Sequence, residues 1–263
     1  MNIEDFLPKY PNITKKDYQF LNPYKDDFYD VIFKKKEFYD ERLTEEEPLP
    51  TEKGVQMKHQ KIISRFFSSY TIYDELILVH EMGTGKTCSA IGAVEQIKNE
   101  NNNFKGVYIF AKGVNLLNNF KKELRDNCTG GQYIPEGHNP EEKDGGCGKP
   151  VHKRYGLSER ELAIRSKKLY DDYYNFNTFE TFAKHLHSLS DAEIQERYSN
   201  YIIVIDEVHN LRIQDVTEKN RISMYTEFHR FLHLIKNRKI LLLSGTPMKS
   251  HFLIRKCDLY LKK

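Results

Sequence analysis

The sequence of 263 residues has no tryptophan and only four cysteines, and no apolar run approaches the roughly 20 residues that a membrane-spanning helix needs. The N-terminus, MNIEDFLPKY, has acidic residues and a proline where a secretory signal has a basic start and an apolar stretch. These absences argue against a membrane partner and against export. We therefore expect an intracellular protein in a reducing compartment. Its cysteines, Cys88, Cys128, Cys147 and Cys257, are then most simply free thiols.

Charge of neither sign dominates, since the net charge is only +3. Residues 1–50 hold 8 Lys/Arg against 12 Asp/Glu, so the rest of the chain is mildly basic. A basic body is compatible with nucleic acid, but ordinary solvated faces explain it equally well. Composition alone therefore leaves the partner open.

The first 50 residues differ in character from the rest and form a predicted N-terminal extension, residues 1–50. Disordered tails are usually poor in aromatic residues, whereas this segment contains ten, so we expect it to pack against the body. They include Phe6, Tyr10, Tyr18, Phe20, Phe28, Phe33 and Phe38. We assign residues 51–250 to one domain, with a Gly- and Pro-rich inserted loop at 128–156, and residues 251–263 to a basic tail.

Within the domain, short apolar runs alternate with helical patterns. Strands are expected at 76–80, 107–111, 201–207 and 239–244, and helices at 86–100 and 114–127. The first helix has Ala90, Val94 and Ile97 on one face, and the second has Leu116, Phe120 and Leu124 at helical spacing. This alternation predicts an α/β fold with a mostly parallel sheet and crossover helices.

The stretch HEMGTGKT, residues 80–87, joins the first strand to the first helix. Glycines let backbone N–H groups turn toward phosphate oxygens, and the helix N-terminus adds partial positive charge. Lys86 would then reach the β and γ phosphates of a nucleotide, and the Thr87 hydroxyl would bind Mg²⁺. The general phosphate-loop pattern has glycine at position 80, where this chain has histidine. A plain Gly-containing turn is the alternative.

Two further motifs follow buried strands. The apolar run IIVI is followed by Asp206 and Glu207. Asp206 could hold Mg²⁺ through a water, and Glu207 could polarise the water that attacks the γ-phosphate. A helix N-cap is the simpler role for acids at the end of a strand. LLLSGTPM, residues 241–248, ends another strand in small hydroxyl residues, as an ordinary turn can. His209 could be a general base, because histidine titrates near neutrality, or a structural histidine. The three motifs together make a nucleotide site the stronger interpretation.

HEMGTGKT, DEVH and SGTPM resemble motifs I, II and III of superfamily 2 helicases, closest to the Swi/Snf-like branch and to helicases and early-transcription ATPases of large DNA viruses. The resemblance implies a RecA-like, three-layer αβα fold that binds ATP and Mg²⁺. The nucleotide would contact Gln60, His80, Glu81, Met82, Gly83, Thr84, Gly85, Lys86 and Thr87. The implied catalytic residues are Lys86, Asp206, Glu207 and His209, with Thr87 and Asp206 on the metal and Ser244, Gly245 and Thr246 in coupling. In the family, the residue at the place of His209 couples the acid pair to motif III, so the resemblance implies that role for His209. Ala111, Lys112 and Gly113 would lie near a DNA or RNA backbone, and NTFETF at 177–182 is similar to motif Ib.

Such motors use two RecA-like lobes, and the resemblance in this chain ends at residue 248. We therefore expect one lobe of the two, which binds ATP with Mg²⁺ but hydrolyses it slowly alone. Its partners would be nucleic acid and a second lobe or a transcription-complex subunit, and a viral chain would act in the host cytoplasm or virion. A catalytically silent ATP-binding or interaction module is the alternative. A small-molecule kinase is disfavoured because it needs no SGTP element.

Four soft ligands in the inserted loop, Cys128, His138, Cys147 and His152, could bind zinc tetrahedrally. Their spacing fits no common zinc finger, because there is neither a CxxC pair nor an HxxxH pair. Free thiols and exposed imidazoles are therefore the favoured interpretation.

Overall fold

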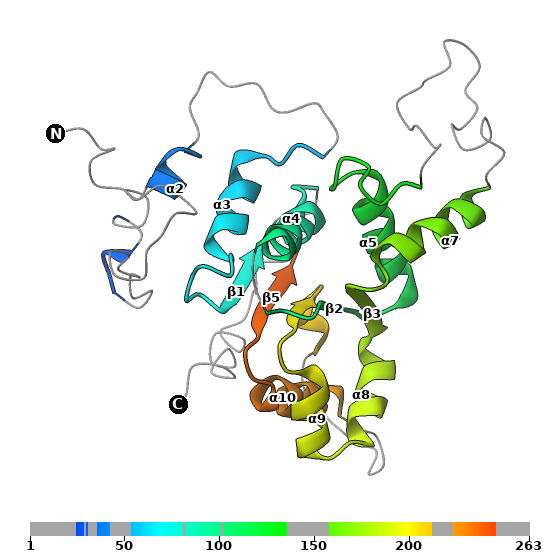
Figure 1. Ribbon diagram of the computed structural model, residues 1–263. Coiled ribbons are helices and arrows are strands. Elements are labelled where there is room, and N and C mark those ends of the chain that lie inside the picture. Colours follow the sequence, from blue (N-terminus) through cyan, green and yellow to red (C-terminus); the bar gives the residue numbers. More distant parts are fainter. Residues whose placement is uncertain are drawn as a thin grey trace.

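A computed structural model describes residues 25–28, 30, 36–42, 54–80, 83–100, 103–135, 158–211 and 223–245 (Figure 1). Helices and strands alternate through most of this part of the chain. In order they are α2 (Lys36–Tyr39), α3 (Lys58–Phe66), β1 (Glu75–Val79), α4 (Lys86–Asn99), β2 (Val107–Ala111), α5 (Val114–Asp126), α7 (Glu159–Tyr170), β3 (Tyr174–Thr178), α8 (Phe179–His187), α9 (Asp191–Tyr198), β4 (Ile202–Ile205), the 3-10 helix η2 (Val208–Leu211), α10 (Met224–Leu234) and β5 (Lys239–Ser244). No helix among these residues is long and apolar enough to cross a membrane.

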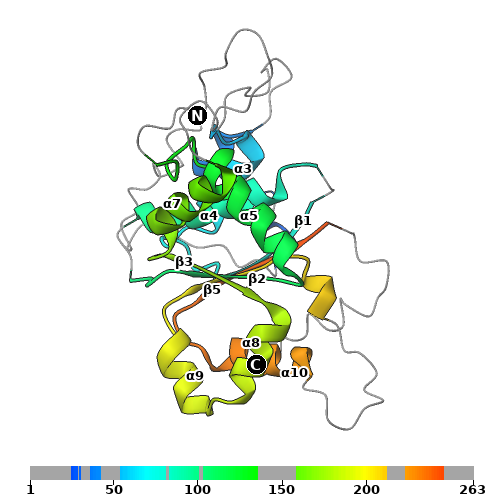
Figure 2. The same ribbon diagram turned by 90° about the vertical axis from the view of Figure 1, so that its right-hand side faces the viewer.

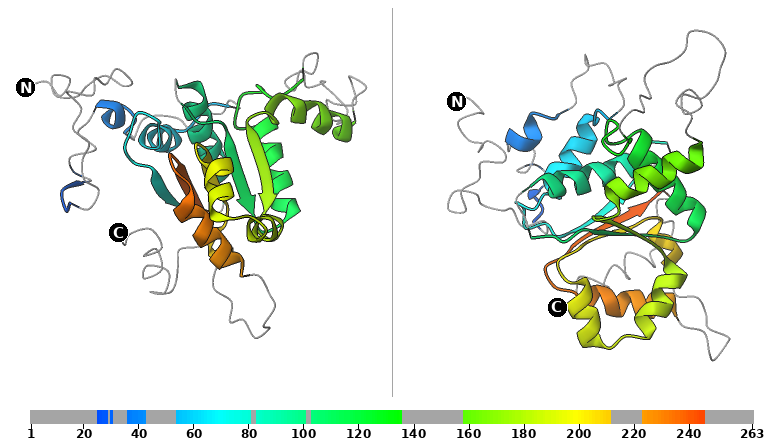
Figure 3. Two further views of the ribbon diagram at one scale, coloured as in Figure 1. Left: turned by 60° about the horizontal axis from the view of Figure 1, so that its bottom comes forward. Right: turned by 45° about the vertical axis from the view of Figure 1, so that its right-hand side comes forward.

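The five strands form one parallel sheet in the order β1-β5-β4-β2-β3. Helices α3, α4, α5 and α7 cover one face, and α8, α9 and α10 cover the other (Figure 2). The predicted RecA-like, three-layer α/β fold is therefore confirmed. The last strand, β5, lies between β1 and β4, although all the other strands precede it in the chain. Figure 3 shows this arrangement from two further directions.

The first hydrophobic cluster lies between the sheet and α4 and α5. Ala90, Val94 and Ile97 are fully buried there, as the spacing predicts. On α5 the prediction is partly wrong. Phe120 and Leu124 are buried in this cluster as predicted, but Leu117 is buried with them in place of Leu116, which is 37% exposed. Because adjacent helical residues lie 100° apart, only one of two neighbouring leucines can face the sheet.

The second cluster lies on the opposite face and is rich in aromatic residues. Phe110 of β2 contacts Phe182 of α8 and Phe228 of α10, with ring centroids 4.5 Å and 5.2 Å away. Edge-on and tilted ring pairs of this kind pack large apolar areas closely. They hold α8 and α10 against the sheet.

Part of the N-terminal extension packs against the body, as expected from its aromatic content. Phe28 and Phe38 are buried against Phe66 and Tyr73, with the Phe28 and Tyr73 ring centroids 6.0 Å apart. Glu41 adds an ion pair to Arg65 of α3 at 2.8 Å. The other aromatic residues named above, Phe6, Tyr10, Tyr18, Phe20 and Phe33, lie outside the described residues.

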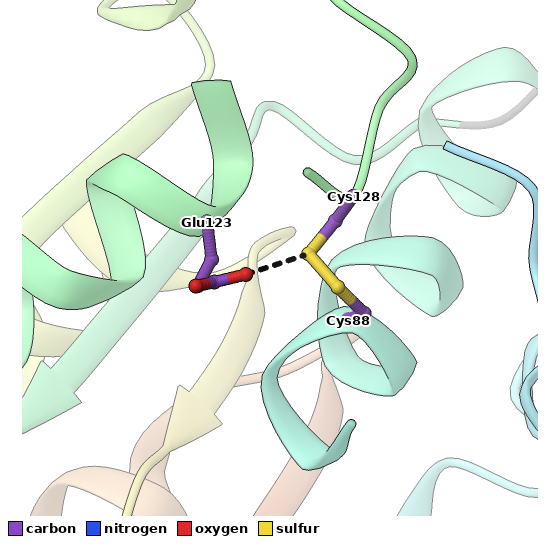
Figure 4. A group of neighbouring side chains, drawn as sticks. All are labelled: Cys88, Glu123 and Cys128. Atoms are coloured by element: carbon purple, nitrogen blue, oxygen red, sulfur yellow. Dashed lines mark hydrogen bonds between the residues drawn. A yellow bond between two sulfur atoms is a disulfide. The ribbon is translucent and has the colours of Figure 1, made fainter. Parts of the chain in front are cut away.

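The expectation of free thiols is wrong for two of the four cysteines. Cys88 on α4 and Cys128, just after α5, form a disulfide with their Cα atoms 5.1 Å apart (Figure 4). The sequence does not reveal this pair, because only the packing of α4 beside α5 brings residues 40 positions apart together. The first residues of the predicted insert also join the core, since Cys128 and Tyr133 are buried. Residues 136–157, which include Cys147, lie outside the described part of the chain, and so does Cys257.

Candidate functional site

The strand order brings the three sequence motifs to one edge of the sheet. Parallel strands end at the same edge, and β1, β5 and β4 are neighbours, so the phosphate loop, the hydroxyl motif and the acid pair follow adjacent strands. The backbone N–H of His80 donates to the carbonyl of Ser244 at 3.1 Å. This bond extends the β1–β5 pairing to the residues where the motifs begin.

The loop at residues 83–85 has the backbone that a phosphate site needs. Gly83 and Gly85 have φ angles of 87° and 78°, in the left-handed region that glycine adopts at little cost. Gly85 is the N-cap of α4, so Lys86 and Thr87 lie on the first turn. His80 is not among the described residues with positive φ, which explains why a side chain is tolerated where the general pattern has glycine. Glu81 and Met82 lie outside the described residues.

Lys86 is ion-paired with both acids of the DEVH motif. Its Nζ lies 3.4 Å from Asp206 Oδ1 and donates a hydrogen bond to Glu207 Oε1. The three side chains are largely buried, with exposed fractions of 14%, 11% and 22%. The phosphate loop and the acid pair, about 120 positions apart in the sequence, therefore form one polar cluster.

The two acids have opposite pKa shifts. Burial raises the pKa of Asp206 above its ordinary value, and the opposing charge of Lys86 does not cancel this effect. Burial also acts to raise the pKa of Glu207, but hydrogen bonds from Lys86 and from the N–H of Gly245 outweigh it and lower that pKa. Glu207 is therefore held as a carboxylate at neutral pH.

Glu207 also has an unusual backbone, with a φ of 51°. Non-glycine residues rarely adopt this region, and such strain is concentrated at functional sites. The Glu207 carboxylate accepts a hydrogen bond from the Gly245 N–H, with an N···O distance of 3.1 Å. Asn210, which sequence reasoning missed, donates from Nδ2 to the Glu207 carbonyl at 3.1 Å. Its place directly after DEVH is the only sequence signal for this contact.

His209 contacts both of the motifs that it was expected to couple. Its Nδ1 lies 3.2 Å from Glu207 Oε2 and 3.4 Å from Ser244 Oγ. A single ring nitrogen thus lies between the acid pair and the end of β5. Thr246, the third residue of the predicted coupling group, lies outside the described residues.

Gln60 is buried directly beside the phosphate loop. Its Oε1 accepts from the Met57 N–H at 2.9 Å, and its Nε2 donates to the Gly85 carbonyl at 3.3 Å. A Cβ at Gly85 would lie 2.7 Å from Gln60 Nε2, so the two residues are tightly packed. The rings of His59, the residue before Gln60, and His80, the residue after β1, have centroids 5.7 Å apart.

The predicted nucleic-acid segment follows the other half of the sheet. Ala111 ends β2 opposite Thr178 of β3, which brings the segments resembling motifs Ia and Ib side by side. The Ala111 side chain is buried in the core, whereas Lys112 is exposed. Within this segment, Lys112 therefore offers its side chain to a ligand, and Gly113 offers open space beside its backbone.

The residues present fit a hard divalent cation. Asp206 Oδ1 is buried without a hydrogen-bond partner among the described residues, although the Lys86 ammonium lies 3.4 Å away. Carboxylate and hydroxyl oxygens are the ligands that Mg²⁺ prefers, and Thr87 begins the neighbouring helix. Of the four residues considered for zinc, Cys128 is bonded to Cys88, and His138, Cys147 and His152 lie outside the described residues.

Comparison with known proteins identifies the family. The family described as "Type III restriction enzyme, res subunit" matches residues 53–249, most of the chain. The chain belongs to this family of superfamily 2 helicase domains. The chain is 37% identical over 261 residues to the "Putative helicase 087L" of Invertebrate iridescent virus 3, and the alignment covers 94% of this chain. It is 38% identical over 191 residues to the "Putative helicase 009L" of Frog virus 3, covering 72% of this chain.

The predicted resemblance to helicases of large DNA viruses is therefore confirmed. The chain spans about a fifth of the length of these relatives, 23% of the first and 18% of the second. A solved structure titled "Sulfolobus solfataricus SWI2/SNF2 ATPase core in complex with dsDNA" aligns over 80% of this chain and 36% of its own, with 16% identity and a TM-score of 0.45. That structural likeness is too distant to bear on function.

Proposed function

We propose that the helicase domain binds ATP with Mg²⁺ at the edge formed by β1, β5 and β4, and that it drives movement along DNA or RNA. The observation that carries this proposal is the single cluster of Lys86, Asp206 and Glu207, linked through His209 to Ser244. It combines a cation for phosphates, an acid that suits a metal, and an ionised carboxylate.

Each residue has a distinct role in this proposal. Lys86 leaves the acids and binds the terminal phosphates, and Asp206 and Thr87 hold the metal. Bound Mg²⁺ would neutralise the charge that develops on the phosphoryl group. Glu207, as a carboxylate, orients the attacking water and accepts its proton. His209 contacts both Glu207 and Ser244, and it transmits the rearrangement of the acid pair on ATP binding to the end of β5.

The helicase names of the relatives support a nucleic-acid substrate. Lys112 and Gly113, at the end of β2, are proposed to contact the sugar–phosphate backbone. Backbone contacts carry little sequence information, so either nucleic acid suits this segment. We propose that a second RecA-like lobe completes the site and that the whole protein acts in viral transcription.

Substitution of Glu207 by Gln tests the proposed chemistry. The variant should bind ATP–Mg²⁺ about as tightly as the wild type, whereas single-turnover hydrolysis should fall by about 100-fold or more, because the amide cannot accept a proton. A Lys86→Ala variant should instead lose nucleotide binding. Hydrolysis that survives in the Glu207→Gln variant would show that Glu207 does not activate the water, whereas ATP binding without any hydrolysis by the wild type would favour the silent ATP-binding module.

A further inference from the structure

The Cys88–Cys128 disulfide lies next to the proposed nucleotide site. Cys88 follows the proposed metal ligand Thr87 on the first turn of α4, and Cys128 follows the end of α5 (Figure 4). The first turn of α4 also carries Lys86. A covalent bond at Cys88 therefore restrains the turn whose position decides where the proposed phosphate and metal ligands lie.

The turn that contains Cys128 also contacts the chain leading to Gln60. The N–H of Gly54 donates to the Asn127 carbonyl at 2.8 Å. A Cβ at Gly54 would lie 2.3 Å from the backbone of Gly130, so the two segments touch directly. The turn at Asn127–Gly130 thus joins both walls of the site, the start of α4 and the segment before α3.

The two sulfurs differ in how accessible they are to a small molecule. Cys88 is partly exposed, so a small thiol or disulfide can reach it, whereas Cys128 is only 8% exposed. Glu123 Oε2 lies 3.9 Å from Cys128 Sγ and accepts a hydrogen bond from Asn127 Nδ2 at 3.0 Å. The cluster therefore contains a fixed acceptor for a thiol proton when the cysteines are reduced.

We propose that Cys88 and Cys128 are a redox modification site that controls the affinity of the phosphate loop for ATP, an inference that rests on the proposed function. A low-molecular-weight disulfide is the oxidant. One protein thiol loses its proton and attacks that disulfide, which forms a mixed disulfide and releases one small thiol. The second protein sulfur then displaces the other small thiol. The protein pair loses two electrons and two protons, and the small disulfide is reduced to two thiols.

The crosslinked form should bind ATP more tightly. In this form the loop already has Gly83 and Gly85 in the left-handed region and α4 formed from Lys86 onward. Reduction leaves the turn at Asn127–Gly130 held only by noncovalent contacts, so the nucleotide must order the loop as it binds. Preorganisation lowers that cost, and we expect oxidation to tighten binding about three- to tenfold.

The experiment compares the oxidised and reduced forms of the 263-residue chain. The protein is treated with oxidised glutathione or with a phosphine reductant, and the Cys88–Cys128 crosslink is quantified by peptide mass mapping after alkylation. ATP–Mg²⁺ affinity is then measured by calorimetry for each form. The Cys88→Ser and Cys128→Ser variants should bind ATP with the same affinity in both treatments. A Cys147→Ser/Cys257→Ser double variant, which keeps only the proposed pair, should retain the full response.

Three results would overturn the proposal. They are no crosslink between Cys88 and Cys128 after oxidation, equal ATP affinity of the two wild-type forms, or an undiminished redox response in the Cys88→Ser variant. The comparison of the wild-type forms needs no substitution, so it stands even if a variant folds poorly. If neither form binds ATP, the proposed function itself fails. Tight but equal binding refutes only the redox control.

Discussion

The N–H of Gly245 donates a hydrogen bond to Glu207 Oε2 at 3.1 Å. This bond ties the end of β5 to the carboxylate proposed to orient water. Because the Lys86 ammonium donates to the other oxygen, both oxygens of the Glu207 carboxylate are held by hydrogen bonds.

Removing that donor should impair hydrolysis more than binding. Gly245→Pro has no N–H, so the loss of a hydrogen bond to a charged group, worth about 1.5–3 kcal/mol, predicts a decrease of roughly 10- to 100-fold in single-turnover hydrolysis. Gly245→Ala keeps the N–H and is the matched control. Equal hydrolysis by the two variants would show that the bond does not position Glu207.

The two loop glycines should respond differently to alanine. Both have positive φ, so each substitution costs about 1–2 kcal/mol of folding free energy. Gly83→Ala places its methyl group in open space, whereas Gly85→Ala would meet Gln60 Nε2 at 2.7 Å. The Gly85→Ala variant should therefore be about 1 kcal/mol less stable than the Gly83→Ala variant, because the clash displaces the hydrogen bond from Gln60 to the Gly85 carbonyl. Urea unfolding of the pair measures this difference, and equal midpoints would argue against the clash.

Asp206 should lower the stability of the unliganded domain at neutral pH. Because burial raises its pKa in the folded state, the folded chain binds the proton more tightly than the unfolded chain. Protonated Asp206 thus contributes stability below the ordinary aspartate pKa of about 3.9, and this contribution is lost as the pH rises through the raised pKa of the folded state. Asp206→Asn should raise the Tm on the order of 1–3 °C at pH 7, with the gain shrinking toward pH 4.

The control for this substitution is Asp172→Asn, at an exposed turn position. Its Tm should follow that of the wild type across the same pH range. A neutral or destabilising effect of Asp206→Asn at pH 7 would contradict the sign of the shift.

Lys239 should stabilise the fold through its buried ammonium. The side chain is 2% exposed, and its Nζ donates to the carbonyls of Thr71 and Tyr73 at 3.3 Å and 3.1 Å. Lys239→Met would leave both carbonyls without this donor, at a cost of about 1–3 kcal/mol each. Thermal and urea unfolding should both register the loss. Lys236→Met, at an exposed position nearby, should change stability little.

Local patterns in the sequence predicted four of the five strands, all except β3, and the three motifs. Val204 and Leu241, for example, lie in uninterrupted apolar runs, which parallel sheets covered on both faces require. The acid pair and the hydroxyl motif were likewise recognisable from the residues that follow such runs. These features depend on neighbours within a few positions.

Contacts between distant segments could not be predicted in the same way. The Cys88–Cys128 bond depends on how α4 packs beside α5, and the Gln60–Gly85 bond on how α3 packs against the loop. The positive φ of Glu207 is favoured by no local residue preference, since glutamate rarely adopts it. Each depends on the tertiary arrangement of whole elements.

The position of β5 has a consequence for how the domain folds. Leu241 pairs with Leu76 on one side and with Val204 on the other, so β1 and β4 are joined only through the last strand. During synthesis, β1 leaves the ribosome long before its neighbour exists, and closing such distant pairs is slow. The nucleotide-binding edge is therefore assembled in one late step, and until then the nascent chain carries open strand edges that are prone to aggregation.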